Sequence, residues 1–177
     1  MTEKATSKID VYPVSKDGVA GAPIVQSSAG TTPFGFASGK QNTLVVSEAG
    51  TSSASSYTIG SDGTIALNSG VVALHQLAPC WVAMTKNGRY AYVANAQSGS
   101  ISGYSVSGSG ALSLLDPSGV TAIVNAGAVD LAVSGDSRYL YQLDGSRISA
   151  FKIQADGDLQ ALGSIARPAG SAGMAAL

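Results

Sequence analysis

Four polar residues recur at equivalent places in the 177-residue chain, each at the start of a polar stretch that ends in an aromatic side chain. They are Glu3, Glu48, Asn95 and Asp144. Carboxylates that point toward one axis repel one another and raise each other's pKa, so such a group could act as general acids and bases or coordinate a hard cation. The alternative is that each side chain caps the end of a strand and accepts hydrogen bonds from nearby loop amides.

The polar stretches belong to an internal repeat. It is marked by four closing aromatics that lie 45, 47 and 47 residues apart, namely Tyr12, Tyr57, Tyr104 and Phe151. Each aromatic is followed by a turn signal, written SKDG at 15–18, GSDG at 60–63, GSGSG at 106–110 and QADG at 154–157. Because Asp-Gly supplies the positive φ of a tight turn, these signals predict β-hairpins.

Each repeat has room for four strands. In the third copy, apolar or alternating segments occupy 81–85, 89–95, 101–106 and 111–116, separated by short polar turns. We expect essentially no helix, because no long segment combines helical periodicity with freedom from glycine. A four-stranded antiparallel sheet of this size cannot bury both faces alone. The repeat therefore predicts an all-β chain folded as a β-propeller, with a β-sandwich as the weaker alternative.

The chain also resembles a known family, the seven-bladed lactonase-like propellers, which include 6-phosphogluconolactonases and 3-carboxymuconate-cyclase-like proteins. The resemblance is carried by TEKATSKIDVYPV, TPFGFASG followed by LVVSEAG, CWVAMTKNGRYAYVANAQSGSISGY, and VDLAVSGDSRYLY leading into ISAFKIQADGDLQALG. Members of that family are close to twice this length. The chain is thus similar to the C-terminal half of such a propeller.

Strand counting predicts blades with unfinished ends. With strands lettered a to d from the axis outward, we expect strands b to d of a first blade at 2–27, full blades at 34–69, 80–116 and 129–165, and a lone inner strand at 173–177. Folded proteins normally close such open edges. One chain could close as a four-bladed ring, or two chains could exchange terminal strands in an eight-bladed homodimer.

The angle between blades favours the second closure. Blades shaped for a sevenfold ring meet at about 51°, which is nearer to the about 45° of an eightfold ring than to the about 90° of a fourfold one. We therefore expect a homodimer in which residues 174–177 of one subunit pair with the first blade of the other.

A propeller places the ends of its b strands and the starts of its a strands around the central channel, where ligands usually bind. We expect a ligand-binding face there, formed by Phe34, Glu48, Trp81, Asn95, Asp130 and Asp144. The family resemblance implies that Glu3 is part of a catalytic site. However, the family's histidine has no counterpart in this chain, and no convergence is evident among Arg89, Arg138, Arg147 and Arg167.

These observations favour a binding or scaffold domain that takes a small lactone or sugar acid. The alternative is a lactone hydrolase or muconate cycloisomerase that uses the channel carboxylates, which needs a base for water and a positive group for the developing oxyanion. His75 is expected in a surface loop and Cys80 as a buried apolar thiol, both in structural roles.

Composition excludes several function classes. The net charge is −1 and no cluster of Lys and Arg is present, so the chain lacks the phosphate-binding surface of a nucleic-acid-binding protein. The single cysteine excludes an intrachain disulfide and a zinc site with several thiolates. No apolar run approaches the length of a membrane span, and the N-terminal residues lack the apolar core of a secretory signal. We expect a cytoplasmic protein that contacts no membrane and uses no metal or cofactor.

Overall fold

The computed structural model describes residues 1–168 and 170–177. Its regular structure is almost entirely β-strand, arranged in four antiparallel sheets, which confirms the expected all-β class and is consistent with a propeller. One short 3-10 turn, η1 (Lys40–Asn42), is the departure from the expectation of no helix among the described residues. It lies in a hairpin connection and leaves the sheets unchanged.

The first sheet contains β1 (Thr2–Glu3), β2 (Lys8–Val11) and β3 (Ile24–Ser27). The second contains β4 (Pro33–Ser38), β5 (Thr43–Glu48), β6 (Ser53–Ile59) and β7 (Ile65–Ala73). The third contains β8 (Pro79–Met84), β9 (Tyr90–Asn95), β10 (Ser100–Val106) and β11 (Leu112–Leu114), and β12 (Ala122–Ile123) also pairs with β10. The fourth contains β13 (Asp130–Val133), β14 (Tyr139–Leu143), β15 (Arg147–Ile153) and β16 (Leu159–Ala166).

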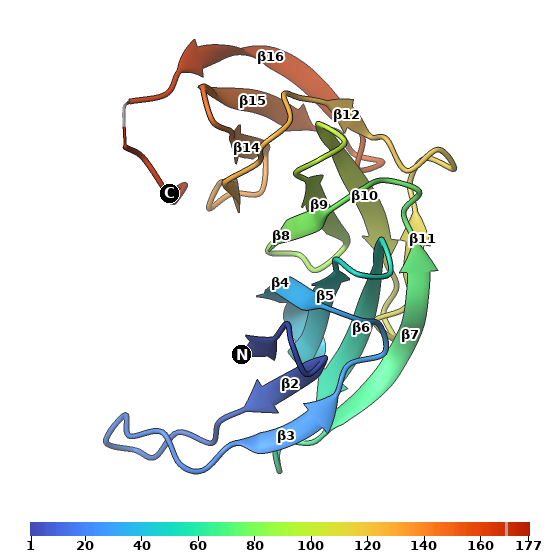
Figure 1. Cartoon of the computed structure of the whole chain (residues 1–177), viewed down its shortest axis with the longest axis vertical. Helices are drawn as coiled ribbons and strands as arrows, with labels where there is room; N and C mark the ends of the chain where they lie inside the picture. Colours follow the sequence, from blue (N-terminus) through green and yellow to red (C-terminus); the bar gives the residue numbers. More distant parts are fainter. Residues whose placement is uncertain (169) are drawn as a thin grey trace.

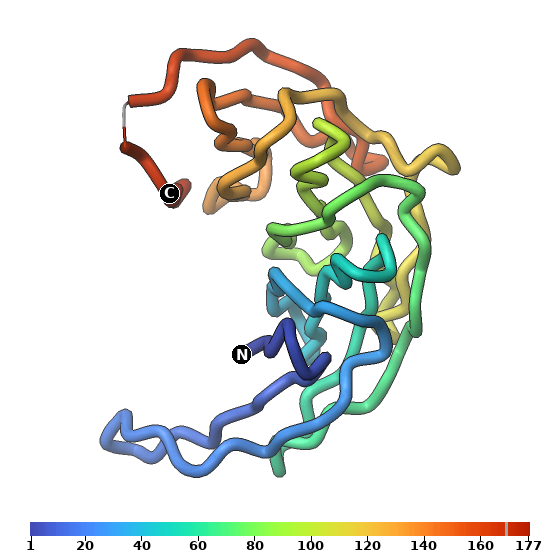
Figure 2. The backbone as a smooth tube through the Cα atoms, in the orientation of Figure 1, coloured from blue at the N-terminus to red at the C-terminus, as the bar shows by residue number. Residues whose placement is uncertain are grey.

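The four sheets follow one another around an open arc (Figure 1). Their inner strands contact in sequence, β1 with β4, β4 with β8 and β8 with β13. Figure 2 shows the two termini on either side of the opening. A single chain therefore does not close as a four-bladed ring in this structure, and the end faces of the arc are left without a neighbouring sheet.

Hydrophobic cores lie between successive sheets, because each sheet packs apolar side chains against its neighbour. Between the first and second sheets the core contains Ile9, Leu44, Val46 and Tyr57. Between the second and third it includes Val45, Val93 and Tyr104, and between the third and fourth it includes Tyr92, Leu140 and Phe151. The repeat thus predicts the core well, since the closing aromatics of the last three copies all lie in it.

The inner strands approach very closely near the axis. A Cβ atom on Gly35, in β4, would lie 2.1 Å from the main-chain oxygen of Cys80 in β8. No side chain larger than hydrogen fits there without a shift of the backbone. This contact fixes the spacing between the second and third sheets where the candidate site is built.

The two ends of the chain differ from complete blades. Strand β1 has two residues, whereas the equivalent β5 and β9 have six. Residues 173–177, expected as an inner strand supplied to another chain, form no strand in the single chain. The exchange of this segment between two chains stays a prediction. Across the described ranges, no helix has the length and apolar character needed to span a membrane.

Candidate functional site

An aromatic pair and a cation lie together on the inner strands, at the ends of the blades where the polar loops meet. Phe34 in β4 and Trp81 in β8 contact edge to face, with ring centroids 5.6 Å apart and an interplanar angle of 87°. The Lys4 ammonium lies 4.5 Å from the centre of the Phe34 ring. Each of these geometries is favourable for the pair that forms it.

The local sequence explains why these residues meet. Lys4 directly follows β1, while Phe34 and Trp81 lie near the starts of β4 and β8, and the contacts of β4 with β1 and with β8 bring the three residues to one end. The Thr2 hydroxyl donates to the Phe34 carbonyl oxygen at 2.6 Å, which fixes β1 against β4. The Ser47 hydroxyl donates to the Cys80 carbonyl oxygen, also at 2.6 Å, which fixes β5 against β8.

Glu3 precedes Lys4 and is half-buried. Its carboxylate accepts a hydrogen bond from the Thr6 hydroxyl. In the part of the chain that the structure describes, no His or Arg side chain bonds to it. Its predicted catalytic role therefore stays a prediction, with Lys4 as the cation nearest to it in sequence.

The other candidate acid–base partners lie elsewhere. His75 is exposed in the loop between β7 and β8, where its backbone has a left-handed φ of 57°. Arg89 and Arg138 lie at the beginnings of β9 and β14, the opposite ends of the blades from Glu3, and stack on the tyrosines that follow them. None of these three side chains bonds to Glu3, whose hydrogen-bond partner is Thr6.

Glu48 is fully buried between the first two sheets. Its Oε1 accepts a hydrogen bond from the Ser28 hydroxyl, and its Oε2 has no partner in the described chain. Burial raises the pKa of Glu48 above its ordinary value, although hydrogen bonds from Ser28 and the Gly30 backbone oppose the shift. The carboxyl connects the loop after β3 to the second sheet.

Asn95 and Asp144 are also fully buried, and each is bonded locally. The Asn95 amide donates to the hydroxyls of Ser100 at 3.0 Å and Ser102 at 2.8 Å. Asp144 Oδ1 accepts from the backbone N–H groups of Ser146 at 2.6 Å and Arg147 at 2.8 Å. Burial acts to raise the pKa of Asp144, but these hydrogen bonds outweigh it and the net shift is downward.

Asn95 and Asp144 thus bond to residues close to them in the chain, whereas Glu48 accepts from Ser28 in the loop after β3. The predicted ligand-binding role of these three residues stays a prediction. Among the described residues, no group of three or more His, Cys, Asp and Glu side chains is placed to hold a metal ion.

Asp130 and Cys80 have other local functions. Asp130 Oδ1 accepts from the Leu131 N–H at 2.8 Å, and Oδ2 accepts from the Met174 N–H at 2.6 Å, so Asp130 holds the C-terminal segment near β13. Cys80 is a free, half-buried thiol. Burial raises the pKa of Cys80, although the charge of Lys4 acts in the opposite direction.

Of the residues predicted from sequence, the structure brings together Phe34 and Trp81 and adds Lys4, which sequence reasoning missed. The available signal was the position of Lys4, next to Glu3 at the end of an inner strand. A separate pocket is lined mostly by apolar residues of the first two sheets, together with Thr2 and Asp10, and lies at the opposite ends of the strands. We place the candidate site at Lys4, Phe34 and Trp81, because a cation and an edge-to-face aromatic pair meet there at the polar end of the inner strands.

Comparison with known proteins gives the family. Residues 1–128 match the family described as lactonase, 7-bladed β-propeller. No curated protein matches the sequence of the chain. Among solved structures, a functionally unknown protein from Desulfotomaculum acetoxidans is 18% identical with a TM-score of 0.74, and the alignment covers 89% of this chain and 49% of that one.

Two further structures are similar. A protein from Lactobacillus plantarum is 18% identical with a TM-score of 0.74, covering 93% of this chain and 52% of the other. The periplasmic gluconolactonase PpgL of Pseudomonas aeruginosa is 21% identical with a TM-score of 0.69, covering 89% and 50%. The chain thus spans about half the length of the solved structures that it matches. From the family match over most of its length, together with the four-sheet arc, the chain belongs to the lactonase family of seven-bladed β-propellers.

Proposed function

We propose that this chain is a small-molecule-binding propeller domain that takes a sugar acid or its lactone at Lys4, Phe34 and Trp81. In this proposal it acts mainly as a binding or scaffold domain and assembles as a homodimer by exchange of terminal strands. The observation that carries the ligand site is the Lys4 ammonium, 4.5 Å from the Phe34 ring, beside the Phe34–Trp81 pair. The predicted cytoplasmic location stays a prediction.

The chemistry of the three side chains fits such a ligand. The C–H face of a sugar is apolar and can pack on an aromatic ring, while its carboxylate needs a positive partner. Lys4 is exposed and has no carboxylate within salt-bridge distance among the described residues. Its ammonium is therefore free to bind an anion without first breaking an ion pair.

The sequence contains one tryptophan, so Trp81 fluorescence reports directly on this site. We expect gluconate to change the emission of Trp81 in a saturable way. Loss of a charge-assisted contact is worth about 1.5–3 kcal/mol, so Lys4→Met should weaken binding by about tenfold or more. Lys16→Met, which removes an equally exposed lysine from the loop between β2 and β3, is the matched control and should bind as the unmodified chain does. An unchanged emission, or equal affinities of the two variants, would sink the proposed site.

A catalytic function is the second candidate, because one of the similar structures is a gluconolactonase and Glu3 lies next to Lys4 in the chain. In that case Glu3 is the base for water, or the proton-transfer group of a muconate cycloisomerase, and Lys4 stabilises the developing negative charge. Hydrolysis of δ-gluconolactone, followed in parallel for Glu3→Gln and the exposed control Asp17→Asn, separates the two functions. If Glu3→Gln abolishes hydrolysis and Asp17→Asn does not, the result supports a catalytic function. If the unmodified chain does not hydrolyse the lactone, or Glu3→Gln leaves hydrolysis unchanged, the result supports the binding function.

A further inference from the structure

The closing aromatics of the repeat reveal how each sheet binds the one before it. Tyr57, Tyr104 and Phe151 occupy the same position of the third strand of their blades and are all buried. The Tyr57 hydroxyl accepts from the Ala29 N–H of the first sheet's last loop at 2.7 Å. The Tyr104 hydroxyl donates to the Val72 carbonyl oxygen of the second sheet at 3.2 Å. An aromatic inserted into the preceding sheet is thus the repeated contact between sheets.

Tyr12 is the fourth member of this set, but no sheet precedes it. Its side chain is 37% exposed, whereas Tyr57 is 2% and Tyr104 is 0% exposed. Val25, paired with Asp10 in the same sheet, is also an exposed apolar residue. We call the uncovered face formed by Asp10, Tyr12 and Val25 the leading face.

The leading face also contains a buried carboxylate, that of Asp10, with an oxygen that has no hydrogen-bond partner in the described chain. Asp10 alternates with Ile9, which packs against the second sheet, so the Asp10 side chain lies on the opposite side of the first sheet. It is 3% exposed, and its Oδ1 has no hydrogen-bond partner in the described chain. A buried carboxylate oxygen without a donor is costly, which indicates that this face is incomplete in the single chain.

The other end of the arc presents a complementary surface. In the third sheet, Tyr92 and Ile101 are fully buried against the fourth. Their equivalents by strand register, Tyr141 and Ile148, line an open hollow on the fourth sheet instead. We call this hollow the trailing face; it is lined by Tyr141, Ile148, Ala150, Leu162, Gly163, Ser164 and Ile165.

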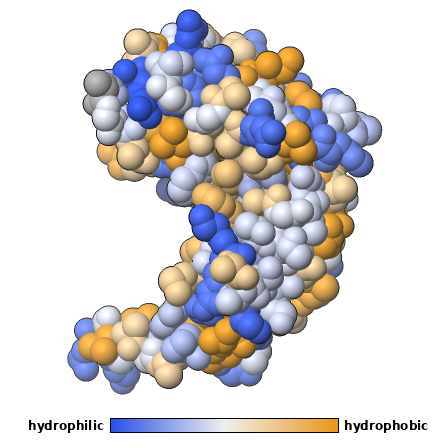
Figure 3. Space-filling model, in the orientation of Figure 1, coloured by the Kyte–Doolittle hydropathy of each residue, from blue (hydrophilic) through white to orange (hydrophobic). Residues whose placement is uncertain are grey.

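The two faces cannot meet within one chain. They lie at opposite ends of the arc (Figures 1 and 2), and the space-filling view shows the deep notch between those ends (Figure 3). Leu162 and Ile165 of the trailing face are 54% and 67% exposed. Exposed apolar surface of this kind on a sheet normally marks a contact with another molecule.

We propose that a second copy of this chain covers both faces, with Tyr12 of each copy inserted into the trailing face of the other. This inference rests on the proposed two-chain assembly and specifies its interface. Two such contacts related by a twofold axis close the ring, and no leading or trailing face is left to recruit a third chain.

The register also predicts the hydrogen bond that Tyr12 makes. Val72, the acceptor of the Tyr104 hydroxyl, pairs with Ala54, and Ile165 pairs with Ile148 in the equivalent place of the fourth sheet. The Tyr12 hydroxyl of one copy should therefore donate to the Ile165 carbonyl oxygen of the other. This hydrogen bond between two chains would be equivalent to the one that the Tyr104 hydroxyl makes with Val72 within one chain.

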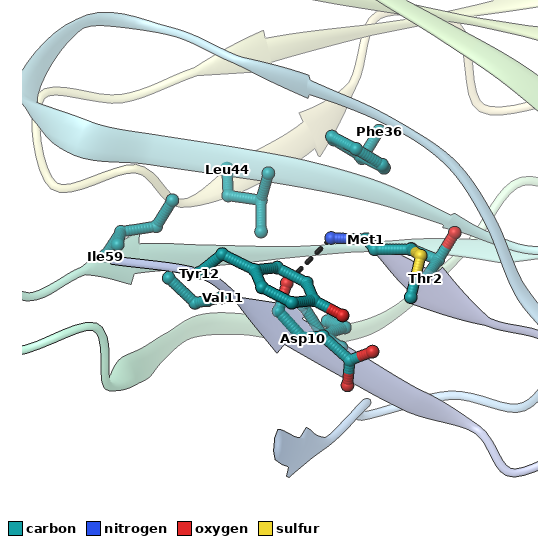
Figure 4. A pocket seen from close by; sticks show the side chains of 9 residues that line it. Met1, Thr2, Asp10, Val11, Tyr12, Phe36, Leu44 and Ile59 are labelled. Atoms are coloured by element: carbon teal, nitrogen blue, oxygen red, sulfur yellow. Dashed lines mark hydrogen bonds between the residues drawn. The ribbon is translucent and has the colours of Figure 1, made fainter. Parts of the chain in front are cut away.

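The short strand β1 gives the second copy a further site. The Met1 ammonium bonds to the Asp10 carbonyl oxygen at 2.7 Å, next to the paired residues of β1 and β2. Figure 4 shows the pocket that borders this point, with Leu44 and Ile59 on one side and Met1, Asp10 and Tyr12 on the other. Residues 173–177 pair with no strand in the described part of their own chain, where Asp130 holds Met174, and are the segment that would lie along β1 of the other copy.

Size-exclusion chromatography with light scattering on the full chain tests the interface. We expect a mass of two chains at micromolar concentration. Tyr12→Glu or Ile165→Glu places an unpaired charge in the contact between the two chains. Each substitution should raise the dissociation constant of the homodimer by at least about a hundredfold. Ile123→Glu, at an apolar residue that is 83% exposed and lies on neither face, is the matched control and should keep the two-chain mass.

A second measurement does not depend on disruptive variants. In a Cys80→Ser background, chains with Tyr12→Cys are mixed with chains with Ile165→Cys and treated with a short bis-maleimide. We expect a cross-linked pair from the mixture and little from either chain alone. A one-chain mass for the unmodified protein, a two-chain mass that survives both glutamate changes, or no cross-link in the mixture would each overturn the interface. Because ligand binding is read separately from Trp81, failure of the interface and failure of the ligand site are distinguishable.

Discussion

The hydroxyl of Tyr92 provides a sharp test of how the sheets are held together. Tyr92 in β9 is fully buried, and its hydroxyl donates at 2.7 Å to the carbonyl oxygen of Gly157, in the hairpin between β15 and β16. Burial raises the pKa of Tyr92, so the group stays protonated and remains a donor at all ordinary pH values. Tyr92→Phe keeps the ring in the core and removes only this bond between the third and fourth sheets.

The expected loss of unfolding free energy follows from the carbonyl oxygen that Tyr92→Phe leaves without a donor. Gly157 is buried, so its carbonyl oxygen would have no replacement partner, and an unsatisfied buried acceptor costs about 1–3 kcal/mol. For a chain of this size, 1 kcal/mol corresponds to about 2–4 °C in the midpoint of thermal unfolding. We therefore expect Tyr92→Phe to lower the midpoint by several degrees.

Tyr90→Phe is the matched control. The Tyr90 hydroxyl donates at 2.7 Å to the Ala155 carbonyl oxygen in the same hairpin, but Ala155 is exposed and water can replace the donor. Its loss should cost about 0.5 kcal/mol. Urea unfolding followed by Trp81 fluorescence, at one fixed protein concentration, gives both free energies. Equal losses of unfolding free energy for the two variants would refute the reasoning that the hydrogen bond to the buried Gly157 oxygen stabilises the fold more than the bond to the exposed Ala155 oxygen.

Two further predictions concern the inner strands and the buried carboxyl. Gly35→Ala places a Cβ 2.1 Å from the Cys80 oxygen and should destabilise the fold by about 1–3 kcal/mol or more, whereas Gly70→Ala, whose Cβ meets no atom closer than 4.0 Å, should cost much less in the same urea titration. Because burial raises the pKa of Glu48 above its ordinary 4.5, the unfolded chain ionises first as the pH rises through that value, and the carboxyl then stabilises the fold less at neutral pH than in acid. The stability of Glu48→Gln relative to the unmodified chain should therefore increase between about pH 4 and about pH 7, and a difference that is independent of pH would contradict this.

Much of the fold follows from periodicity in the sequence. The spacing of Tyr12, Tyr57, Tyr104 and Phe151 predicts equivalent strands, and the turn signals after them predict hairpins. Both are local patterns that a strand must satisfy if alternate residues are to be buried. The core confirms this, since Tyr57, Tyr104 and Phe151 all lie between sheets.

The candidate site was harder to predict from the sequence. Position in the repeat indicates that Glu48, Asn95 and Asp144 end equivalent strands, but it does not say whether a side chain there faces the axis or a neighbouring loop. That direction depends on which groups the adjacent sheet offers, such as Ser28 for Glu48. Lys4 was missed for the same reason, because its aromatic partner belongs to another blade.

The sequence by itself determined the strands, the turns and the repeated aromatic positions, because these depend on residues close together in the chain. Only the tertiary structure decided which groups the buried polar residues bond to, that Lys4 meets Phe34 beside Trp81, and that the sheets form an open arc. Those outcomes depend on how neighbouring sheets pack against one another, and that packing joins residues that are far apart in the chain, such as Lys4 with Phe34 and Phe34 with Trp81.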